Sequence, residues 1–122
     1  MNILGIDFGT KRIGLAWMQK GLDVILPYGV VTGEELPAFV KKEKIDLLVV
    51  GLPLGAEGEE NPNTKRVRAF AENLKKETGL PVEFVDERYT THEANTMGGG
   101  ASLDEKAAML ILESYLAELS DK

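Results

Sequence analysis

Two apolar runs near the start of the chain are separated by only a short turn, and this spacing favours a β-hairpin. Residues 2–8 and 13–18 are rich in Ile and Leu, and the sequence "GTKR" joins them. A third β-rich run, residues 24–31, follows at once and contains Pro27. Because proline cannot donate a hydrogen bond to a neighbouring strand, we expect the third run at an edge of the sheet.

The next part of the chain alternates between helix and strand patterns. Residues 33–44 predict a short helix, and residues 45–52 form a continuous apolar run typical of a central strand that is covered on both faces. Residues 61–79 carry helix signals at both ends, and residues 81–87 predict a fifth strand. Helical connections of this kind join parallel strands, so the later strands are predicted to be parallel.

The last part of the chain predicts two further helices. Residues 90–97 favour a short capped helix, and residues 98–100, "GGG", predict a flexible joint. Ser102 and Glu105 have the spacing of a capping box, which predicts the start of a final helix. His92 falls in the first turn of the short helix, and we interpret it as a surface residue rather than a catalytic base.

Together these patterns predict an α/β fold. The sheet is mixed and five-stranded, with three antiparallel strands followed by two parallel ones, and helices cover both of its faces. We expect residues 1–122 to form a single domain.

Composition narrows the classes of function. The chain has no cysteine, which excludes disulfides and thiolate metal sites and fits a reducing cytoplasm. Its formal charge of -6 has the wrong sign for a protein that coats nucleic acid over its whole surface. No apolar run approaches the roughly 18 residues of a membrane span. We therefore expect a cytoplasmic protein that has no membrane partner and that contacts nucleic acid only locally.

An acidic residue, Asp7, stands at the end of the first apolar run. Side chains alternate along a strand, so Asp7 shares one face with Gly5 and Gly9. A face with so little side chain allows a ligand or another backbone to approach closely. In open sheets, sites form outside the carboxyl ends of parallel strands, which is where Asp7 is predicted to lie.

Two further acids are predicted to point at the same region. Glu87, with Asp86, follows the last strand, and Asp104 heads the stripe of the final helix that packs on the sheet. Carboxylates brought together are unfavourable unless cations arrive, and ligands that are all oxygen favour Mg²⁺ or Mn²⁺. A pair of such ions can cleave phosphodiester bonds, so this pattern predicts a metal-dependent nuclease.

Each acid also has a simpler interpretation. Asp7 could stabilise a turn, and Asp104 could favour the dipole of its helix. Glu87 could pair with Arg88 or Lys11 at the surface. The joint placement of the three acids is what favours a metal site.

Basic residues that could contact nucleic acid occur in two local groups. The first group lies between the first two strands, and the second lies on the helix that follows the fourth strand. The groups are Lys11 with Arg12, and Lys65 with Arg66 and Arg68. Since counterion release governs binding to phosphates, affinity through so few cations should be modest and should fall steeply with salt.

Four segments of the chain resemble, in order and spacing, the four blocks of the YqgF (RuvX) family. They are "GIDFGTKRIGLA", "VVGLPLGAEGEENP", "VDERYTTHEA" and "LDEKAAMLILESYL". The resemblance implies a ribonuclease-H-like fold and a nuclease that either resolves Holliday-junction-like DNA or matures the 5′ end of pre-16S ribosomal RNA. It also implies an acidic triad and a set of residues near phosphate. By residue, these are Asp7, Glu87 and Asp104, and Lys11, Arg12, Arg68 and Arg88.

The chain departs from the family pattern in two places. Gly55 stands where family members usually have Asn, and the segment before the final helix is shorter and lacks lysine. A second subunit, in a homodimer, could supply the missing substrate contacts. Two other functions compete with the nuclease: the sequence "GIDFGT" also resembles the phosphate-binding hairpin of the actin, Hsp70 and sugar-kinase superfamily, and a non-catalytic module could bind RNA or a protein.

Overall fold

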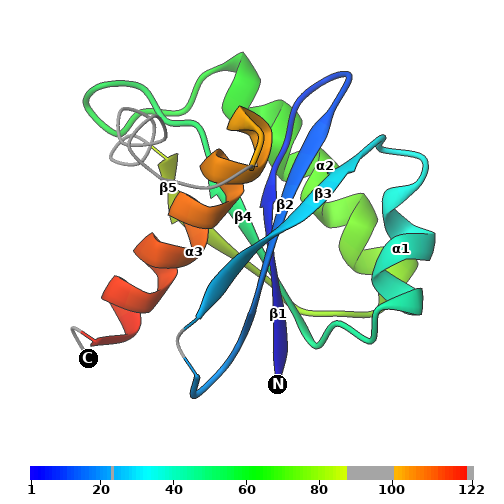
Figure 1. Ribbon diagram of the computed structural model, residues 1–122. Coiled ribbons are helices and arrows are strands. Elements are labelled where there is room, and N and C mark those ends of the chain that lie inside the picture. Colours follow the sequence, from blue (N-terminus) through cyan, green and yellow to red (C-terminus); the bar gives the residue numbers. More distant parts are fainter. Residues whose placement is uncertain (23, 88–100, 121–122) are drawn as a thin grey trace.

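The computed structural model describes residues 1–22, 24–87 and 101–120 and contains one sheet covered by helices on both faces (Figure 1). The elements in chain order are β1 (Asn2–Asp7), β2 (Ile13–Gln19), β3 (Ile25–Val31), α1 (Leu36–Lys42), β4 (Leu47–Leu52), α2 (Pro62–Thr78), β5 (Val82–Asp86) and α3 (Leu103–Ser120). The predicted mixed five-stranded sheet is confirmed. The helix expected over 90–97, His92 and the joint at 98–100 lie outside the described residues.

The strands are arranged in the order β3-β2-β1-β4-β5. The pairs β1–β2 and β2–β3 are antiparallel, whereas β1–β4 and β4–β5 are parallel. The strand that contains Pro27 is at the edge, as predicted. The middle strand of the five is β1, and β4, predicted to be central, is an interior strand that pairs with β1 on one side and β5 on the other. Every residue of β4 is buried, in agreement with its apolar run.

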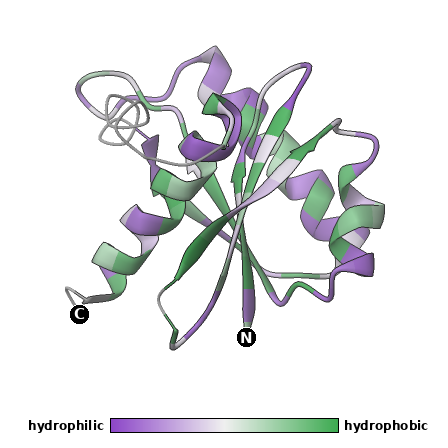
Figure 2. Ribbon diagram, viewed as in Figure 1, coloured by the Kyte–Doolittle hydropathy of each residue, from purple (hydrophilic) through white to green (hydrophobic). Residues whose placement is uncertain are grey.

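Helices α1 and α2 lie on one face of the sheet, and α3 lies on the other (Figure 1). Figure 2 shows mostly hydrophobic strands between helices that alternate hydrophobic and hydrophilic residues. The core on the α1–α2 side includes Leu4, Ile6, Leu15, Leu48, Val50, Val67, Ala71 and Leu74. The core on the α3 side includes Ile3, Ala16, Met18, Val49, Val85, Ala108, Ile111 and Leu112. The alternation of side chains along β1 therefore assigns odd-numbered residues to the α3 side.

Helix α2 begins and ends where its sequence signals predict. Asn61 Oδ1 accepts a hydrogen bond from the backbone N–H of Thr64 at 3.0 Å, and Thr64 Oγ1 accepts one from the N–H of Asn61 at 3.2 Å. Gly79 ends the helix with a left-handed φ of 72°. None of the helices in the described residues is long and apolar enough to cross a membrane.

Helix α3 begins with the predicted capping box. Ser102 Oγ accepts a hydrogen bond from the backbone N–H of Glu105 at 3.2 Å, and Glu105 Oε1 accepts one from the N–H of Ser102 at 3.0 Å. Asp104 therefore lies in a defined first turn, above the α3 face of the sheet.

Candidate active site

The carboxyl ends of β1, β4 and β5 meet at one edge of the sheet because these three strands are parallel. Asp7 is the last residue of β1, and Glu87 directly follows β5. Strand alternation turns both side chains toward α3, since Gly5 and Val85 each pack against that helix. By the same alternation, Asp86 falls on the opposite face. Of the two acids at the end of β5, the structure brings Glu87 to Asp7.

Glycines in three strands make room for α3. A Cβ on Gly5 would lie 2.6 Å from Leu112 Cγ and 2.9 Å from the carbonyl oxygen of Ala108. A Cβ on Gly14 would overlap the backbone of Asp104 and would lie 2.9 Å from its Cβ. The sequence left open whether a ligand or a backbone approaches this glycine-lined face, and the structure identifies the backbone of α3.

Asp7 and Glu87 meet across β4, which lies between their two strands. Neighbouring strands are about 4.8 Å apart, so these side chains start from backbones separated by roughly 10 Å. Between them is Gly51 of β4, where a Cβ would lie only 3.1 Å from Glu87 Cδ. A Cβ on Gly51 would also lie 2.5 Å from Ile111 Cδ1, so the missing side chain leaves space that Ile111 of α3 and the carboxyl group of Glu87 occupy. Glu87 forms a hydrogen bond with Asp7 on this face.

Burial and mutual repulsion change the acidity of this pair. Burial, followed by the hydrogen bond to Asp7 and the negative charge of Asp7, raises the pKa of Glu87 to about 9. Burial also raises the pKa of Asp7, and the charge of Asp104 adds to this effect, whereas the hydrogen bond from Glu87 opposes it. At neutral pH Glu87 therefore keeps its proton and donates a hydrogen bond to Asp7.

Asp104 lies near this pair but is oriented differently. Its Oδ2 forms an ion pair with Arg12 Nε at 3.2 Å, and about a third of its side chain, 30%, is exposed. In the parts of the chain that the structure describes, no three acidic or histidine side chains are grouped closely enough to bind one metal ion. The three predicted acids thus share one face and one edge, but the carboxylate of Asp104 is paired with Arg12.

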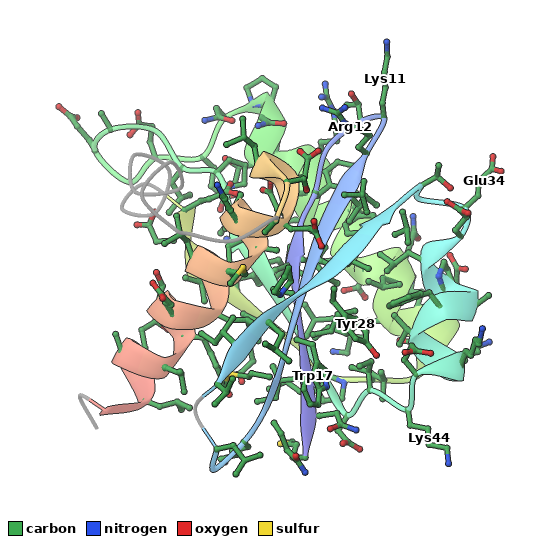
Figure 3. All side chains as sticks on the ribbon, viewed as in Figure 1. Lys11, Arg12, Trp17, Tyr28, Glu34 and Lys44 are labelled. Carbon is green, nitrogen blue, oxygen red and sulfur yellow. The ribbon has the colours of Figure 1, made fainter. Side chains whose placement is uncertain are left out.

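The turn between β1 and β2 carries two basic side chains beside Asp104. Lys11 and Arg12 extend from this turn (Figure 3). Together with Gly9, Thr10 and Asp104, they line an open depression of about 410 Å³. This depression could accept a phosphate group next to Asp104.

The basic residues of α2 lie on the other side of the sheet. The guanidinium of Arg68 is 5.3 Å from the ring centroid of Phe84, a residue of the α1–α2 core. Its Nε also pairs with Glu60 Oε1 at 2.8 Å. Arg66 is exposed on the same helix, and Arg88 lies outside the described residues. The structure therefore brings Lys11 and Arg12 to the acids, but not Arg66 or Arg68.

Sequence reasoning missed Gly14 and Gly51, where α3 and the carboxyl group of Glu87 approach the sheet closely. A glycine inside an apolar strand pattern signals a close backbone approach, and this signal was present at both positions. The structure also accounts locally for Gly55, whose missing side chain leaves space that the carboxylate of Glu59 occupies.

Comparison with solved structures assigns the fold to a known class. A Thermus thermophilus RuvC structure matches with a TM-score of 0.63, covering 98% of this chain and 97% of that chain at 13% identity. The T. thermophilus RuvC in complex with a Holliday junction substrate matches with a TM-score of 0.65 at 12% identity, covering 98% and 96%. These likenesses show that the fold is ribonuclease-H-like.

Comparison of sequences identifies the family. A family model described as "RuvX: Holliday junction resolvase" matches residues 1–118, so the chain belongs to the RuvX family. A relative from Maridesulfovibrio salexigens is 37% identical over 96% of this chain and 98% of its own. A relative from Albidiferax ferrireducens is 43% identical over 97% of this chain and 79% of its own. Both relatives carry the name "Putative pre-16S rRNA nuclease".

Proposed function

We propose that this protein is a divalent-metal-dependent nuclease that hydrolyses phosphodiester bonds in structured nucleic acid. Its family membership and the names of its relatives support maturation of the 5′ end of pre-16S ribosomal RNA as the reaction, with branched DNA as the other substrate class. The observation that carries the proposal is the pair formed by Asp7 and Glu87, two partly buried acids that are joined by a hydrogen bond at the carboxyl ends of the parallel strands. In this proposal residues 1–122 act as one domain in the cytoplasm.

The acidic pair fits a hard divalent cation. Asp7 and Glu87 offer only oxygen ligands, which suit Mg²⁺ and Mn²⁺, and the proton in their hydrogen bond marks a place where positive charge is favourable. Asp7 and Glu87 would hold the cation, and Asp104 would complete the site. When bound, such ions supply an activated water and stabilise the charge on the leaving oxygen.

The remaining side chains of the site would position the substrate. Lys11 and Arg12 would hold phosphate groups in the open depression beside Asp104. Arg12 would exchange its ion pair with Asp104 for a phosphate, which would free that carboxylate to turn toward Asp7. Arg66 and Arg68, on the far layer, would contact only a longer substrate. Arg88 directly follows Glu87 in the sequence and would be a further contact to phosphate.

A cleavage assay tests this proposal. Matched RNA, DNA and four-way-junction substrates are incubated with wild type and with Asp7→Asn, in Mn²⁺, in Mg²⁺ and in a chelator. The RNA substrate carries the 5′ extension of pre-16S ribosomal RNA, and we expect wild type to cleave it only when a metal ion is present. The cleavage rate of Asp7→Asn should be lower by at least about a hundredfold. Glu113→Gln, which removes an exposed acid farther along α3, is the matched control.

One outcome of the cleavage assay would contradict the nuclease function. Binding of RNA without cleavage in any metal ion would favour a non-catalytic RNA-binding module and would overturn the nuclease. Gel filtration of the protein mixed with each substrate would show whether a homodimer forms on the nucleic acid.

A further inference from the structure

Glu105 makes a contact that a capping box does not require. One of its carboxylate oxygens, Oε1, accepts hydrogen bonds from the backbone N–H and the hydroxyl of Ser102, at 3.0 and 3.1 Å. The other oxygen, Oε2, accepts a hydrogen bond from the backbone N–H of Gly29, at 2.8 Å. Gly29 belongs to the edge strand β3 and is 76 residues away in the sequence. One carboxylate therefore caps α3 and ties it to the sheet.

The edge strand is shaped to make this contact. The pairing of β2 with β3 shifts register between Leu15 and Ala16, which leaves Tyr28 without an opposite residue. Next to this bulge, Gly29 has a φ of +104°, a conformation that side chains other than glycine rarely adopt. A bulge changes the direction in which a residue points, and here the N–H of Gly29 donates to α3.

This tie is next to the residue that the site requires. Asp104 directly precedes Glu105, and its backbone rests on Gly14 of β2. Gly14 pairs with Asp7 of β1 on one side and with Val30 of β3 on the other. The first turn of α3 is thus fixed at two consecutive residues: the backbone of Asp104 lies over Gly14, and the side chain of Glu105 is bonded to Gly29. Without such a cap, the first turn of a helix has N–H groups that lack partners and tends to fray.

We propose that Glu105 is a positioning residue, which ties the first turn of α3 to β3 and thereby holds Asp104 beside Asp7 and Glu87. This role rests on the proposed function, because it assumes that Asp104 belongs to the metal site. Glu105 itself contacts neither substrate nor metal in this role. Its effect on the reaction passes through Asp104.

Three variants separate this role from a plain helix cap. Glu105→Ala removes both the cap and the tie to Gly29. Glu105→Gln keeps a residue that serves in capping boxes, but its single acceptor oxygen cannot serve Ser102 and Gly29 together. Ser102→Ala removes the capping hydroxyl and leaves the tie to Gly29 intact, so it is the matched control for lost helix stability.

The measurement is the affinity for Mn²⁺ by calorimetry, together with kcat and KM on the RNA substrate. We expect Glu105→Ala to weaken Mn²⁺ binding and lower kcat by about tenfold, as loss of a residue that orients a metal ligand typically does, with KM for RNA unchanged. Glu105→Gln should show a smaller loss in the same direction, and it carries the test if Glu105→Ala does not fold. Ser102→Ala should melt at a lower temperature yet bind Mn²⁺ like wild type.

A double mutant decides whether the effect passes through Asp104. In a protein that already carries Asp104→Asn, Glu105→Ala should cause no further loss of Mn²⁺ affinity. If the two losses add, or if Ser102→Ala weakens Mn²⁺ binding as much as Glu105→Ala does, the positioning role is overturned. If Asp104→Asn binds Mn²⁺ like wild type, the assignment of Asp104 in the proposed function is itself wrong, and the positioning role fails with it.

Discussion

Asp7 and Glu87 form their hydrogen bond across an intervening strand, over Gly51 of β4. Two acids on neighbouring strands would be close whatever lay around them, but these two meet across Gly51, where a Cβ would lie 2.5 Å from Ile111 Cδ1 and 3.1 Å from Glu87 Cδ. The acidic pair is therefore a property of the sheet as a whole and not of either strand.

The proton on Glu87 predicts how stability depends on pH. The pKa of Glu87 rises from 4.5 in the unfolded chain to about 9 in the folded protein, so the folded state binds the proton more tightly. This contribution to stability is complete below about pH 4.5 and is lost as the pH rises toward 9. In a chelator, the melting temperature should fall between pH 6 and pH 9 by about 4 °C or more, the shift that roughly 1 kcal/mol produces in a small domain.

Glu87→Gln is the control for this pH dependence, because glutamine does not titrate but can still donate a hydrogen bond to Asp7. Thermal unfolding of both proteins across the same pH series isolates the contribution of Glu87. Identical pH dependence in the two proteins would mean that Glu87 does not hold a proton in the folded state.

Removing the charge of Asp7 should have opposite effects with and without metal. In a chelator at pH 9, Asp7→Asn is expected to melt above wild type, because the repulsion with Glu87 and Asp104 is relieved. A metal ion at a hundredfold excess over its Kd stabilises wild type by about 2.7 kcal/mol, and the variant has lost a ligand. Adding Mn²⁺ should therefore reduce or reverse the difference in melting temperature between the two proteins. Equal metal-induced shifts in both proteins would exclude Asp7 from a cation site.

Gly14 is predicted to be indispensable for the position of α3. A Cβ there would meet the backbone of Asp104, which cannot rotate away as a side chain can. Gly14→Ala should cost about 1–3 kcal/mol of stability and weaken Mn²⁺ binding, as measured by denaturant unfolding and calorimetry. Gly33→Ala is the matched control, because the nearest atom to a Cβ there is 4.0 Å away. If Gly14→Ala loses no more stability and no more Mn²⁺ affinity than Gly33→Ala, this account of the helix contact is wrong.

Arg12 and Arg68 are expected to differ in their effect on nucleic-acid binding. Arg12→Gln should weaken RNA binding and reduce the salt dependence of the affinity by about one phosphate contact, since Arg12 lines the depression beside Asp104. The stability of this variant should hardly change. The Arg12 side chain is 73% exposed, and ion pairs at exposed side chains contribute little to stability.

Arg68→Gln is the comparison for the variant of Arg12. It should affect RNA binding less and stability more, because it removes the contact with Phe84 and the ion pair with Glu60. Fluorescence anisotropy with labelled RNA over a salt series measures the binding. A larger loss of RNA affinity for Arg68→Gln than for Arg12→Gln would mean that the substrate binds on the α2 side.

Local patterns in the sequence determined much of this protein. The short turn after β1, Pro27 in β3 and the capping residues Asn61 and Ser102 predicted which elements form, where two helices begin and which strand is at the edge. Alternation along β1 also predicted that Asp7 shares the face of Gly5, opposite Leu4 and Ile6. These features depend on residues that are close in the sequence, so a single segment carries the information.

Only the tertiary structure decided how the acids are related. It places β4 between Asp7 and Glu87, pairs Asp104 with Arg12, and locates Arg68 on the opposite layer from the site. Each of these relationships depends on the order of strands in the sheet and on how closely α3 docks over glycines from three strands. Such contacts join residues that are far apart in the sequence, and no local pattern specifies the distance between them.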